Sequence, residues 1–234
     1  MKYTQEWEKS VYRQARWVDF KNDYKTMDIA YMESVIWAFK ELWKKGLIYE
    51  KDKVMPYSWK AETPISNFET RLDDSYRERT DPAVTVKVKM TDYDIESSIL
   101  IWTTTPWTIP ANKALAYNQA LKYVIVQIND QSDFINRKIV VAKDLFKNVI
   151  EDCEIKDYKI VSEIKGSDFH ETVCSHPFNK LGYDYDIPML EARFVTTEQG
   201  SGIVHCAPSH GPDDFNLCLN NNIKACLLYT SPSP

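Results

Sequence analysis

The stretch that says most about the fold is GIVHCAPSHGPDDF, residues 202–215. Its apolar start is typical of the end of a buried strand, and the proline- and glycine-containing run that follows cannot continue a strand ladder. Pro212 suits the first position of a helix, which puts Asp213 and Asp214 in a first turn where the helix dipole favours negative charge. A strand end, a tight loop and an acidic helix start together predict a site for a ligand that carries an amine or a polarised water.

A second informative stretch is IWTTTPWTIPAN, residues 101–112, which has four threonines, two tryptophans and an asparagine. An extended segment is expected from Ser98 to Thr105, and Pro106 should end it. Threonine hydroxyls at such a strand end can position a water or a substrate ester without being ionised. They also suit a purely structural role, because threonine favours strands and the tryptophans can pack in a core. The stretch by itself leaves both interpretations open.

The two stretches together resemble one family. WTTTPWTIPAN at 102–112 and GSGIVHCAPSHGPDDF at 200–215 are similar to the editing domain inserted in the class I aminoacyl-tRNA synthetases for isoleucine, valine and leucine. Earlier in the chain, ARWVDFKNDYKTMD at 15–28 and VMPYS at 54–58 are similar to the isoleucine enzymes of that family. The resemblance extends over residues 1–224.

The resemblance implies a fragment of an isoleucine-tRNA ligase with an editing, or deacylase, site. That site would use a positioned water to hydrolyse the ester of valine mischarged onto the isoleucine tRNA, whose 3′ end would be the partner. The chain has neither His-x-Gly-His nor Lys-Met-Ser-Lys-Ser, the motifs that bind ATP in this family. We therefore expect no synthetic activity from this chain alone, no cofactor for editing, and a need for ATP and Mg only in the full-length enzyme. Neither a membrane nor a protein partner is implied.

The resemblance also assigns roles to individual residues. Asp214 would bind the α-ammonium group of the substrate. Thr104, Thr105 and Thr108 would hold the attacking water and the terminal adenosine. His205 would line the pocket near the substrate side chain and exclude isoleucine by its bulk.

Further substrate contacts are expected from a second group of residues, namely Trp102, Thr103, Asn112, His210 and Asp213. Thr103 ranks below the other threonines, because strand alternation would turn it to the opposite face. Asp213 also suits the simpler role of complementing the helix dipole. No residue is expected to bind a metal in the editing interpretation.

A metal-dependent hydrolase is one alternative, because four nitrogen and oxygen ligands occur in an H-x4-H-x2-D-D pattern, at His205, His210, Asp213 and Asp214. Such side chains can bind a divalent metal. The predicted helix start weakens this hypothesis, because its dipole favours anions over cations.

A non-catalytic module that binds a tRNA 3′ end is a second alternative, and a fragment without function is a third. Trp102, Trp107 and Phe215 could stack on bases. The net charge of −5 does not indicate the basic surface patch with which proteins usually contact a duplex. It is compatible with a pocket for a single-stranded end.

Composition indicates a folded cytoplasmic protein. Of the 234 residues, 44% are hydrophobic and 13% aromatic, as is typical of globular chains. No apolar run approaches the roughly 18–20 residues that span a membrane, and the N-terminal sequence lacks the apolar core of a signal peptide. The five cysteines include no C-x-x-C pair, which argues against a zinc ribbon and a disulfide framework.

Four segments are predicted with the help of the resemblance. Residues 1–57 would be part of the catalytic body, helical and then extended, and residues 58–82 a connection. Residues 83–224 would be the inserted editing domain, and residues 225–234 an atypical tail that departs from the family pattern. The expected fold class is α+β, with a β-rich, barrel-like editing domain after a helical piece.

Local patterns predict the individual elements. Apolar residues at helical spacing after Asp28 predict a helix that ends at Gly46, with its apolar stripe packed in a core. Shorter apolar runs predict strands at 83–90, 98–105, 121–128, 137–142, 155–164 and 187–196. Short helices are predicted at 143–150 and 212–220.

Overall fold

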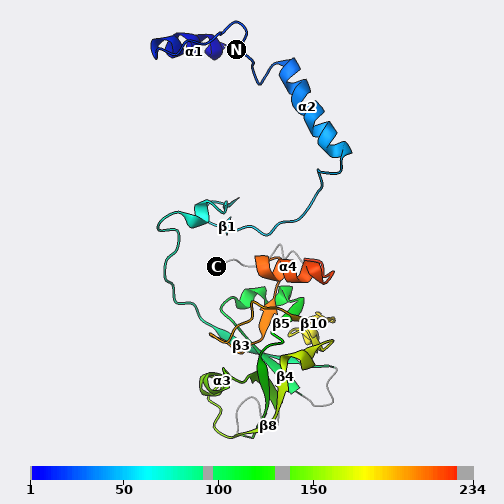
Figure 1. Ribbon diagram of the computed structural model, residues 1–234. Helices are drawn as coiled ribbons and strands as arrows, with labels where there is room; N and C mark the ends of the chain where they lie inside the picture. The colour runs from blue at the N-terminus through cyan, green and yellow to red at the C-terminus, as the bar shows by residue number, and fades with distance from the viewer. Residues whose placement is uncertain (1, 92–96, 130–137, 226–234) are drawn as a thin grey trace. The chain divides into compact units, whose positions relative to one another are not determined.

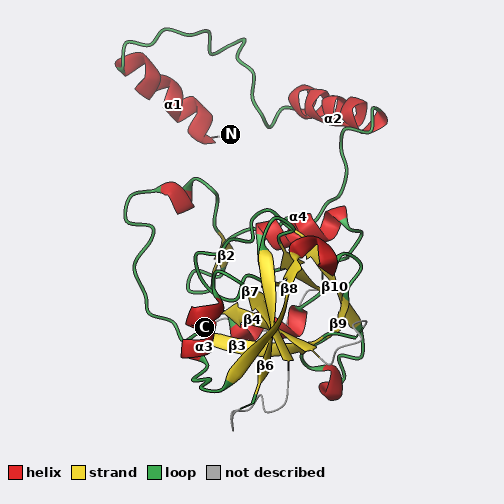
Figure 2. Cartoon of the chain, turned by 60° about the horizontal axis from the view of Figure 1, so that its bottom comes forward, coloured by secondary structure: helices red, strands yellow, loops and turns green. Residues whose placement is uncertain are grey.

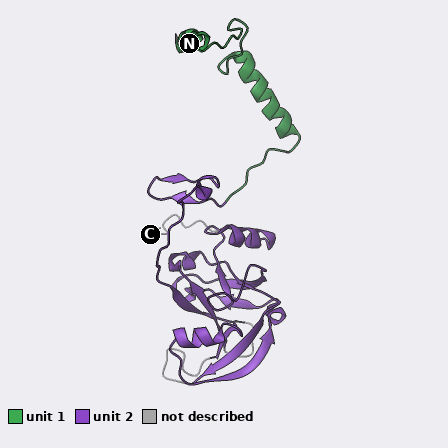
Figure 3. Cartoon of the chain, turned by 60° about the vertical axis from the view of Figure 1, so that its left-hand side comes forward, with its two compact units in different colours: residues 1–53 green, residues 54–234 purple. Residues whose placement is uncertain are grey.

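The computed structural model describes residues 2–91, 97–129 and 138–225 of the chain. The predicted tail at 225–234 therefore lies, beyond its first residue, outside the described part. The chain divides into two compact units, residues 1–53 and 54–234 (Figure 3). The boundaries predicted at 57/58 and 82/83 are finer than this division and stay predictions.

The first unit contains two helices, α1 (Lys2–Arg13) and α2 (Ile29–Lys44). The predicted start and end of α2 are confirmed. Asp28 has an extended backbone at the N-cap, although its carboxylate makes no capping hydrogen bond. At the other end, Gly46 has a φ of +67° and donates its N–H to the Trp43 carbonyl at 2.9 Å. This left-handed termination is easiest for glycine, because it has no Cβ.

The apolar stripe of α2 is exposed, and its predicted packing in a core is wrong for this structure. Val35, Ile36 and Trp43 are 54%, 67% and 62% exposed, and no residue of α2 is buried. Within the described residues of its unit, no other segment covers the stripe. Helical periodicity identifies the face that can be buried, but it cannot supply a partner.

The second unit begins with a small hairpin of β1 (Tyr57–Ser58) and β2 (Thr63–Pro64), followed by the 3-10 turn η1 (Glu69–Arg71). Two larger sheets follow (Figure 2). The first has the strand order β3-β4-β7-β6-β8 and consists of β3 (Val84–Lys89), β4 (Ser97–Thr103), β7 (Lys138–Ala142), β6 (Lys122–Ile128) and β8 (Tyr158–Lys165). Its β4–β7 pair is parallel and its other pairs are antiparallel.

The second large sheet has the strand order β11-β5-β10-β9. Its members are β11 (Val204–Cys206), β5 (Ala114–Tyr117), β10 (Asp186–Glu191) and β9 (Val173–Ser175). The β5–β10 pair is parallel, and β5 pairs with β11 antiparallel. Three further 3-10 turns, η2 (Pro106–Ala111), η3 (Gly166–Phe169) and η4 (Asn179–Leu181), connect the strands.

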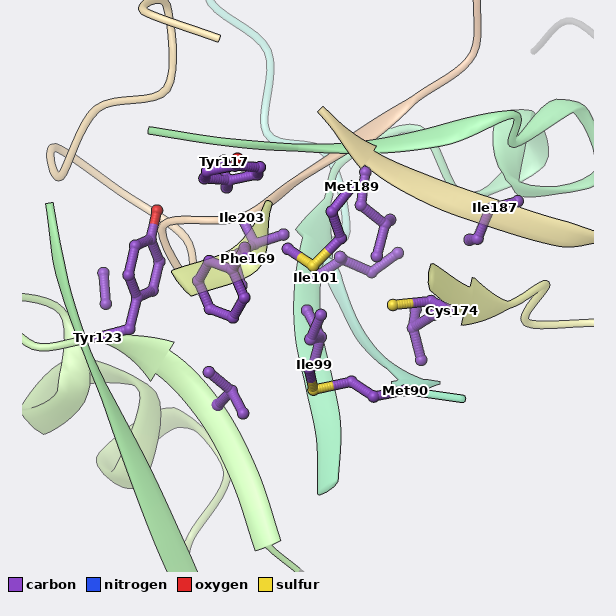
Figure 4. Packing of buried hydrophobic residues seen from close by; sticks show 14 of the residues in the cluster. Met90, Ile99, Ile101, Tyr117, Tyr123, Phe169, Cys174, Ile187, Met189 and Ile203 are labelled. Carbon is purple, nitrogen blue, oxygen red and sulfur yellow. The ribbon is translucent and has the colours of Figure 1, made fainter. Parts of the chain in front are cut away.

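Strand alternation distributes the apolar side chains of β6 between two cores. Val124 and Val126 pack with helix α3 (Phe146–Asp152) on one face of the first sheet. Tyr123 and Ile125 point the opposite way into a core shared by the two sheets. Phe169 lies in this shared core, and its ring contacts that of Tyr123 edge-on at 4.8 Å between centroids (Figure 4).

Helix α4 (Pro212–Asn220) packs on the second sheet, next to β5 (Figure 1). A third apolar cluster forms there, which joins Cys218 of α4 to Ala114 and Ala116 of β5 and to Cys206 of β11. This packing places the first turn of α4 close to the end of β11.

The predicted α+β class and the β-rich second unit are confirmed, but the barrel is not. In the described residues the two sheets face each other across the shared core and do not close into one cylinder. All six predicted strands overlap observed ones. β5 and β9 were missed because four and three residues are too few to show a period.

None of the helices in the described residues combines the length and the apolar character needed to cross a bilayer.

Gly202 provides a test of the packing between the sheets. It has a φ of +78°, and a Cβ added there would collide with the Cβ of Ala142. Gly182 has a φ of +93° but faces open space. Gly182→Ala should cost about 1–2 kcal/mol of unfolding free energy from backbone strain alone. Gly202→Ala should cost about 1–3 kcal/mol more because of the added steric conflict.

Urea unfolding followed by circular dichroism measures both variants. Equal losses of stability in the two variants would contradict this account of the inter-sheet packing.

Candidate functional site

The two motifs of the sequence meet at a cavity of about 320 Å³ in the second unit. The end of β4, the turn η2, strand β11 and the first turn of α4 all contribute side chains to it. Its lining residues are Trp102, Thr103, Thr105, Trp107, Thr108, Val204, His205, Ala207, His210 and Asp214.

Three threonines form a connected hydroxyl network on one side of the cavity. The Oγ1 of Thr103 accepts the Thr105 N–H at 3.0 Å and lies 3.2 Å from the Thr105 Oγ1. The Thr108 hydroxyl donates to the Thr105 carbonyl at 2.8 Å. Pro106 begins η2 directly after Thr105, so the chain turns back and brings Thr108 beside Thr105. The proton of Thr108 is committed to this bond, whereas the Thr105 hydroxyl can still turn toward a ligand.

His205 contacts this network from β11. Its Nε2 lies 2.9 Å from the Thr108 Oγ1. A hydroxyl has one proton, and that of Thr108 goes to the Thr105 carbonyl, so Nε2 must be the donor. Nδ1 is then the unprotonated nitrogen; it is buried and has no hydrogen-bond partner. Burial, aided by the nearby His176 and His210, lowers the pKa of His205 to about 4, which keeps the ring neutral near pH 7.

Asp214 supplies a carboxylate to the same cavity. It lies in the first turn of α4, and its Oδ2 accepts the Ala207 N–H at 2.9 Å. Burial raises the pKa of Asp214, while the bond from Ala207 opposes this effect. Within the described ranges no lysine or arginine forms an ion pair with Asp214. A partly desolvated carboxylate without a counter-ion favours a positively charged ligand.

A second cavity of about 250 Å³ adjoins the first. Trp102, Thr103 and Val204 line both cavities. The far side of the second cavity includes Phe194 and Gln199. A ligand with two linked parts could therefore occupy both.

Comparisons with known proteins agree with the resemblance seen in the sequence. Residues 1–190 match the family described as tRNA synthetases class I (I, L, M and V). The chain belongs to this family. It is 53% identical over 208 residues to an isoleucine–tRNA ligase of Pelagibacter ubique (strain HTCC1062), covering 88% of the chain and 23% of that relative.

A second isoleucine–tRNA ligase, from Corynebacterium efficiens, is 46% identical over 239 residues, covering 93% of the chain and 22% of the relative. This class I synthetase chain thus spans less than a quarter of the length of these curated relatives. Its fold is similar to that of the P. knowlesi cytosolic leucyl-tRNA synthetase editing domain, with a TM-score of 0.50 and 15% identity. That alignment covers 59% of the chain and 62% of the solved structure.

The structure brings most of the predicted site residues of this synthetase chain together. The seven that line the first cavity are Trp102, Thr103, Thr105, Thr108, His205, His210 and Asp214. The expected faces of two threonines are wrong: Thr103 lines both cavities, whereas Thr104 lines only the second. Strand β4 ends at Thr103. The alternation of side chains between the two faces of a strand does not continue beyond that residue, so a prediction that assumed a longer strand assigned the wrong faces.

Two further predicted contacts lie outside both cavities. Asn112 is fully buried behind η2, where its backbone carbonyl accepts the Tyr185 hydroxyl at 3.0 Å. Asp213 is exposed on α4 and lines neither cavity. Its nearby charge nevertheless raises the pKa of Asp214 slightly further, after the effect of burial.

The metal-site hypothesis requires His205, His210, Asp213 and Asp214 to converge. Among the residues that the structure describes, no three or more His, Cys, Asp or Glu side chains are grouped so as to hold a metal ion. Their spacing in sequence suggested ligands, but no three of these four side chains are close enough together to share a metal ion.

The sequence interpretation missed one functional group, the backbone N–H of Ala207. It holds the Asp214 carboxylate, and no side-chain type signals such a role. Trp107 also lines the cavity, although its sequence context suggested only packing or base stacking.

The buried histidines make the stability of this synthetase chain depend on pH. Burial lowers the pKa of His205 and of His176 to about 4, below the ordinary value of 6.5 that they regain on unfolding. Between these values the unfolded state binds protons that the folded state does not, so stability falls as the pH falls. Each histidine should remove roughly 3 kcal/mol between pH 6.5 and pH 4, with no further loss below pH 4.

Urea unfolding near neutral pH and near pH 4 measures this loss, and His205→Gln isolates the contribution of His205. Glutamine keeps an N–H that can reach Thr108 but does not titrate. A pH dependence that is the same in His205→Gln and in the unaltered chain would show that His205 is not the titrating group.

Proposed function

We propose that this chain carries an editing site that uses a positioned water to hydrolyse the ester of valine attached to the isoleucine tRNA. The observation that carries the proposal is the Asp214 carboxylate, which is partly desolvated, held by the Ala207 N–H and free of any described ion pair. It lines a cavity of about 320 Å³ together with Thr103, Thr105 and Thr108. An aminoacyl ester has the matching groups, an ammonium next to an ester carbonyl.

In this proposal Asp214 binds the α-ammonium group by a charge-assisted hydrogen bond. The ester carbon then lies toward the threonine side of the cavity. The Thr105 hydroxyl, whose proton is not committed, orients the attacking water together with Thr103. Thr108 and His205 hold the loop in place and supply no base, because the pKa of His205 is about 4. Catalysis would rest on orientation of the water and on polar stabilisation of the developing charge.

The two adjoining cavities support a substrate that binds in two parts. The aminoacyl group would lie in the first cavity beside Asp214, and the terminal adenosine would extend into the second, where Thr104 lies. His205 would limit the size of the acyl side chain. One methylene in an apolar pocket is worth about 1–3 kcal/mol, a general limit for which isoleucine enzymes are themselves a standard example. An editing site that rejects isoleucine by its size would add discrimination between valine and isoleucine beyond that limit.

The partner in this proposal is the 3′ end of the isoleucine tRNA carrying valine, in the cytoplasm. Editing would need no cofactor, and ATP and Mg would serve only the charging reaction of a full-length isoleucine ligase. The competing proposal is a module that binds the tRNA end without turnover. Trp102 and Trp107 line the cavity and could stack on bases, which is the observation that favours it.

The direct test is deacylation of isoleucine tRNA carrying either valine or isoleucine by the 234-residue chain. Selective release of valine is expected, and EDTA should not reduce it. Binding of the tRNA without release by a folded chain would favour the non-catalytic module. Loss of activity in EDTA would favour a metal-dependent hydrolase.

Two neighbouring aspartates provide a matched control for this test. Asp214→Ala should reduce kcat/KM by about 30-fold or more, because removing the partner of a buried ammonium costs about 2–5 kcal/mol. Asp213→Ala removes the same charge from an exposed position and should keep most of the activity. Normal turnover by a folded Asp214→Ala variant would contradict the proposed role of this carboxylate.

His205 gives a separate prediction about specificity. Replacing its ring by the methyl group of His205→Ala should enlarge the acyl end of the cavity and allow release of isoleucine from correctly charged tRNA. Because the His205–Thr108 bond is also lost, valine release should become slower. The ratio of the two rates measures the effect, and an isoleucyl ester that stays fully protected would show that His205 does not set the size limit.

A further inference from the structure

Ser201 is a buried serine that lies shortly before the strand carrying His205, and the proposed chemistry gives it no role. It is 2% exposed, and β11 begins three residues later. The Ser201 Oγ lies 2.5 Å from the Leu100 carbonyl oxygen and 3.2 Å from that of Ile203. A hydroxyl has one proton, and the nearer acceptor, Leu100, receives it. Because Leu100 belongs to β4, this hydrogen bond joins the two segments that form the proposed site.

Ser201 occupies the place where β4 and β7 separate. The parallel pairing of these strands extends on β4 only from Ser97 to Ile99. One residue further on, the Leu100 carbonyl accepts the Ser201 hydroxyl, while the Ala142 N–H at the end of β7 donates to the Ser201 carbonyl at 2.8 Å. Ser201 therefore bonds to both strands at the point where their pairing with each other has ended.

The glycines on either side fix the position of Ser201. Gly200 and Gly202 have φ values of +81° and +78°, a left-handed conformation that suits glycine. A Cβ on Gly200 would lie 3.4 Å from the Trp102 Cβ, and one on Gly202 would collide with the Cβ of Ala142. The backbone is thus closely packed against β4 on one side and β7 on the other, so the Ser201 hydroxyl has little freedom to choose another partner.

The Ser201–Leu100 bond lies close to the site along both segments. Three residues lead from Leu100 to Thr103, and four lead from Ser201 to His205. An extended chain advances about 3.3 Å per residue, so each of these site residues is within about 10–13 Å of chain from the bond. The same two segments are linked again by the bond between the His205 Nε2 and the Thr108 Oγ1 at 2.9 Å. The first link sets the spacing from which the second can form.

We propose that Ser201 is a positioning residue whose hydroxyl holds the Leu100 carbonyl and thereby sets the distance between the threonines of the site and His205. Its effect passes through the backbone of β4 and β11, and its hydroxyl does not bind the ester or the attacking water. The catalytic readout of this proposal rests on the proposed editing function. Its structural readout does not.

Three serine substitutions test the proposal. Ser201→Ala removes the hydroxyl with little change in volume, and Ser201→Thr keeps a hydroxyl on the same carbon. Ser97→Ala is a matched control, because Ser97 is 1% exposed and lies on the same strand as Leu100. Among the described residues, however, the Ser97 Oγ has no hydrogen-bond partner.

The expected result is a loss of rate without a loss of binding. Misplacing groups in a site by about 1 Å can cost on the order of 10²-fold in rate, so Ser201→Ala should lower kcat for valyl ester hydrolysis about 10- to 100-fold. KM should stay within about twofold, because the hydroxyl does not bind the substrate. Ser201→Thr should recover most of kcat, and Ser97→Ala should leave both constants unchanged.

Three outcomes would overturn the proposal. One is an unchanged kcat in folded Ser201→Ala, and another is an equal loss in Ser201→Thr or in Ser97→Ala. The third is a higher KM at constant kcat, which would show that Ser201 binds the substrate directly.

Should the unaltered chain show no turnover, the editing function fails, and proton NMR of His205 then decides about Ser201. Exchange of the His205 imidazole N–H with water should be at least about tenfold faster in Ser201→Ala than in the unaltered chain or in Ser97→Ala. The reason is that the bond to Thr108 opens more often when β4 and β11 are no longer held together. Equal exchange rates in the three proteins would overturn the proposal.

A measurement on the unaltered chain covers the case in which Ser201→Ala does not fold. A buried hydroxyl proton held in a hydrogen bond exchanges slowly enough to give its own signal in proton NMR spectra. Such a protected signal is expected for the Ser201 hydroxyl. A Ser201 hydroxyl proton that exchanges freely with water would overturn the proposal without any variant.

Discussion

The hydrogen bond between the His205 Nε2 and the Thr108 Oγ1 joins residues that are 97 positions apart in the chain. It connects β11 to η2 where both face the cavity, and so makes one site of two separate motifs. The Thr108 hydroxyl donates its own hydrogen bond to the Thr105 carbonyl. The bond to His205 therefore has one direction, from the imidazole N–H to the Thr108 oxygen. With the proton on Nδ1, two acceptors would face each other. The geometry of the threonine loop therefore depends on the tautomer of one buried ring.

That ring is held in position by both large sheets. β11 pairs with β5 of the second sheet, and this register fixes the direction of His205. The segment just before β11 is bound to the first sheet, because the Ala142 N–H donates to the Ser201 carbonyl at 2.8 Å and the Tyr123 hydroxyl donates to the Gly202 carbonyl at 3.0 Å. A displacement of either sheet would move His205 relative to Thr108. Precision at the site thus depends on packing in the core that the two sheets share.

The parts of this architecture that could be predicted from the sequence are those with local causes. The Schellman-type end of α2 at Gly46 and the acidic first turn of α4 with Asp214 follow from neighbouring residues. β5 could not be predicted, because its four residues become a strand only by pairing with β10 and β11, which lie far along the chain. The faces of Thr103 and Thr104 also escaped prediction, because they depend on the residue at which β4 ends. Short elements and strand ends are set by tertiary contacts that a local pattern does not contain.

Desolvation acts in opposite directions on the two kinds of titratable group at the cavity, and this difference bears on the ligand that we propose for it. Burial raises the pKa of the Asp214 carboxyl and lowers that of His205, so it acts against the charged form of each group. An ammonium ligand stabilises the ionised carboxylate but leaves the neutral imidazole unchanged. An uncharged ligand of the same shape would leave the carboxylate desolvated and unpaired, at a cost that grows as the cavity closes around it. The proposed selectivity for an ester that carries an amine therefore rests on the burial of Asp214, rather than on the number of contacts the ligand makes.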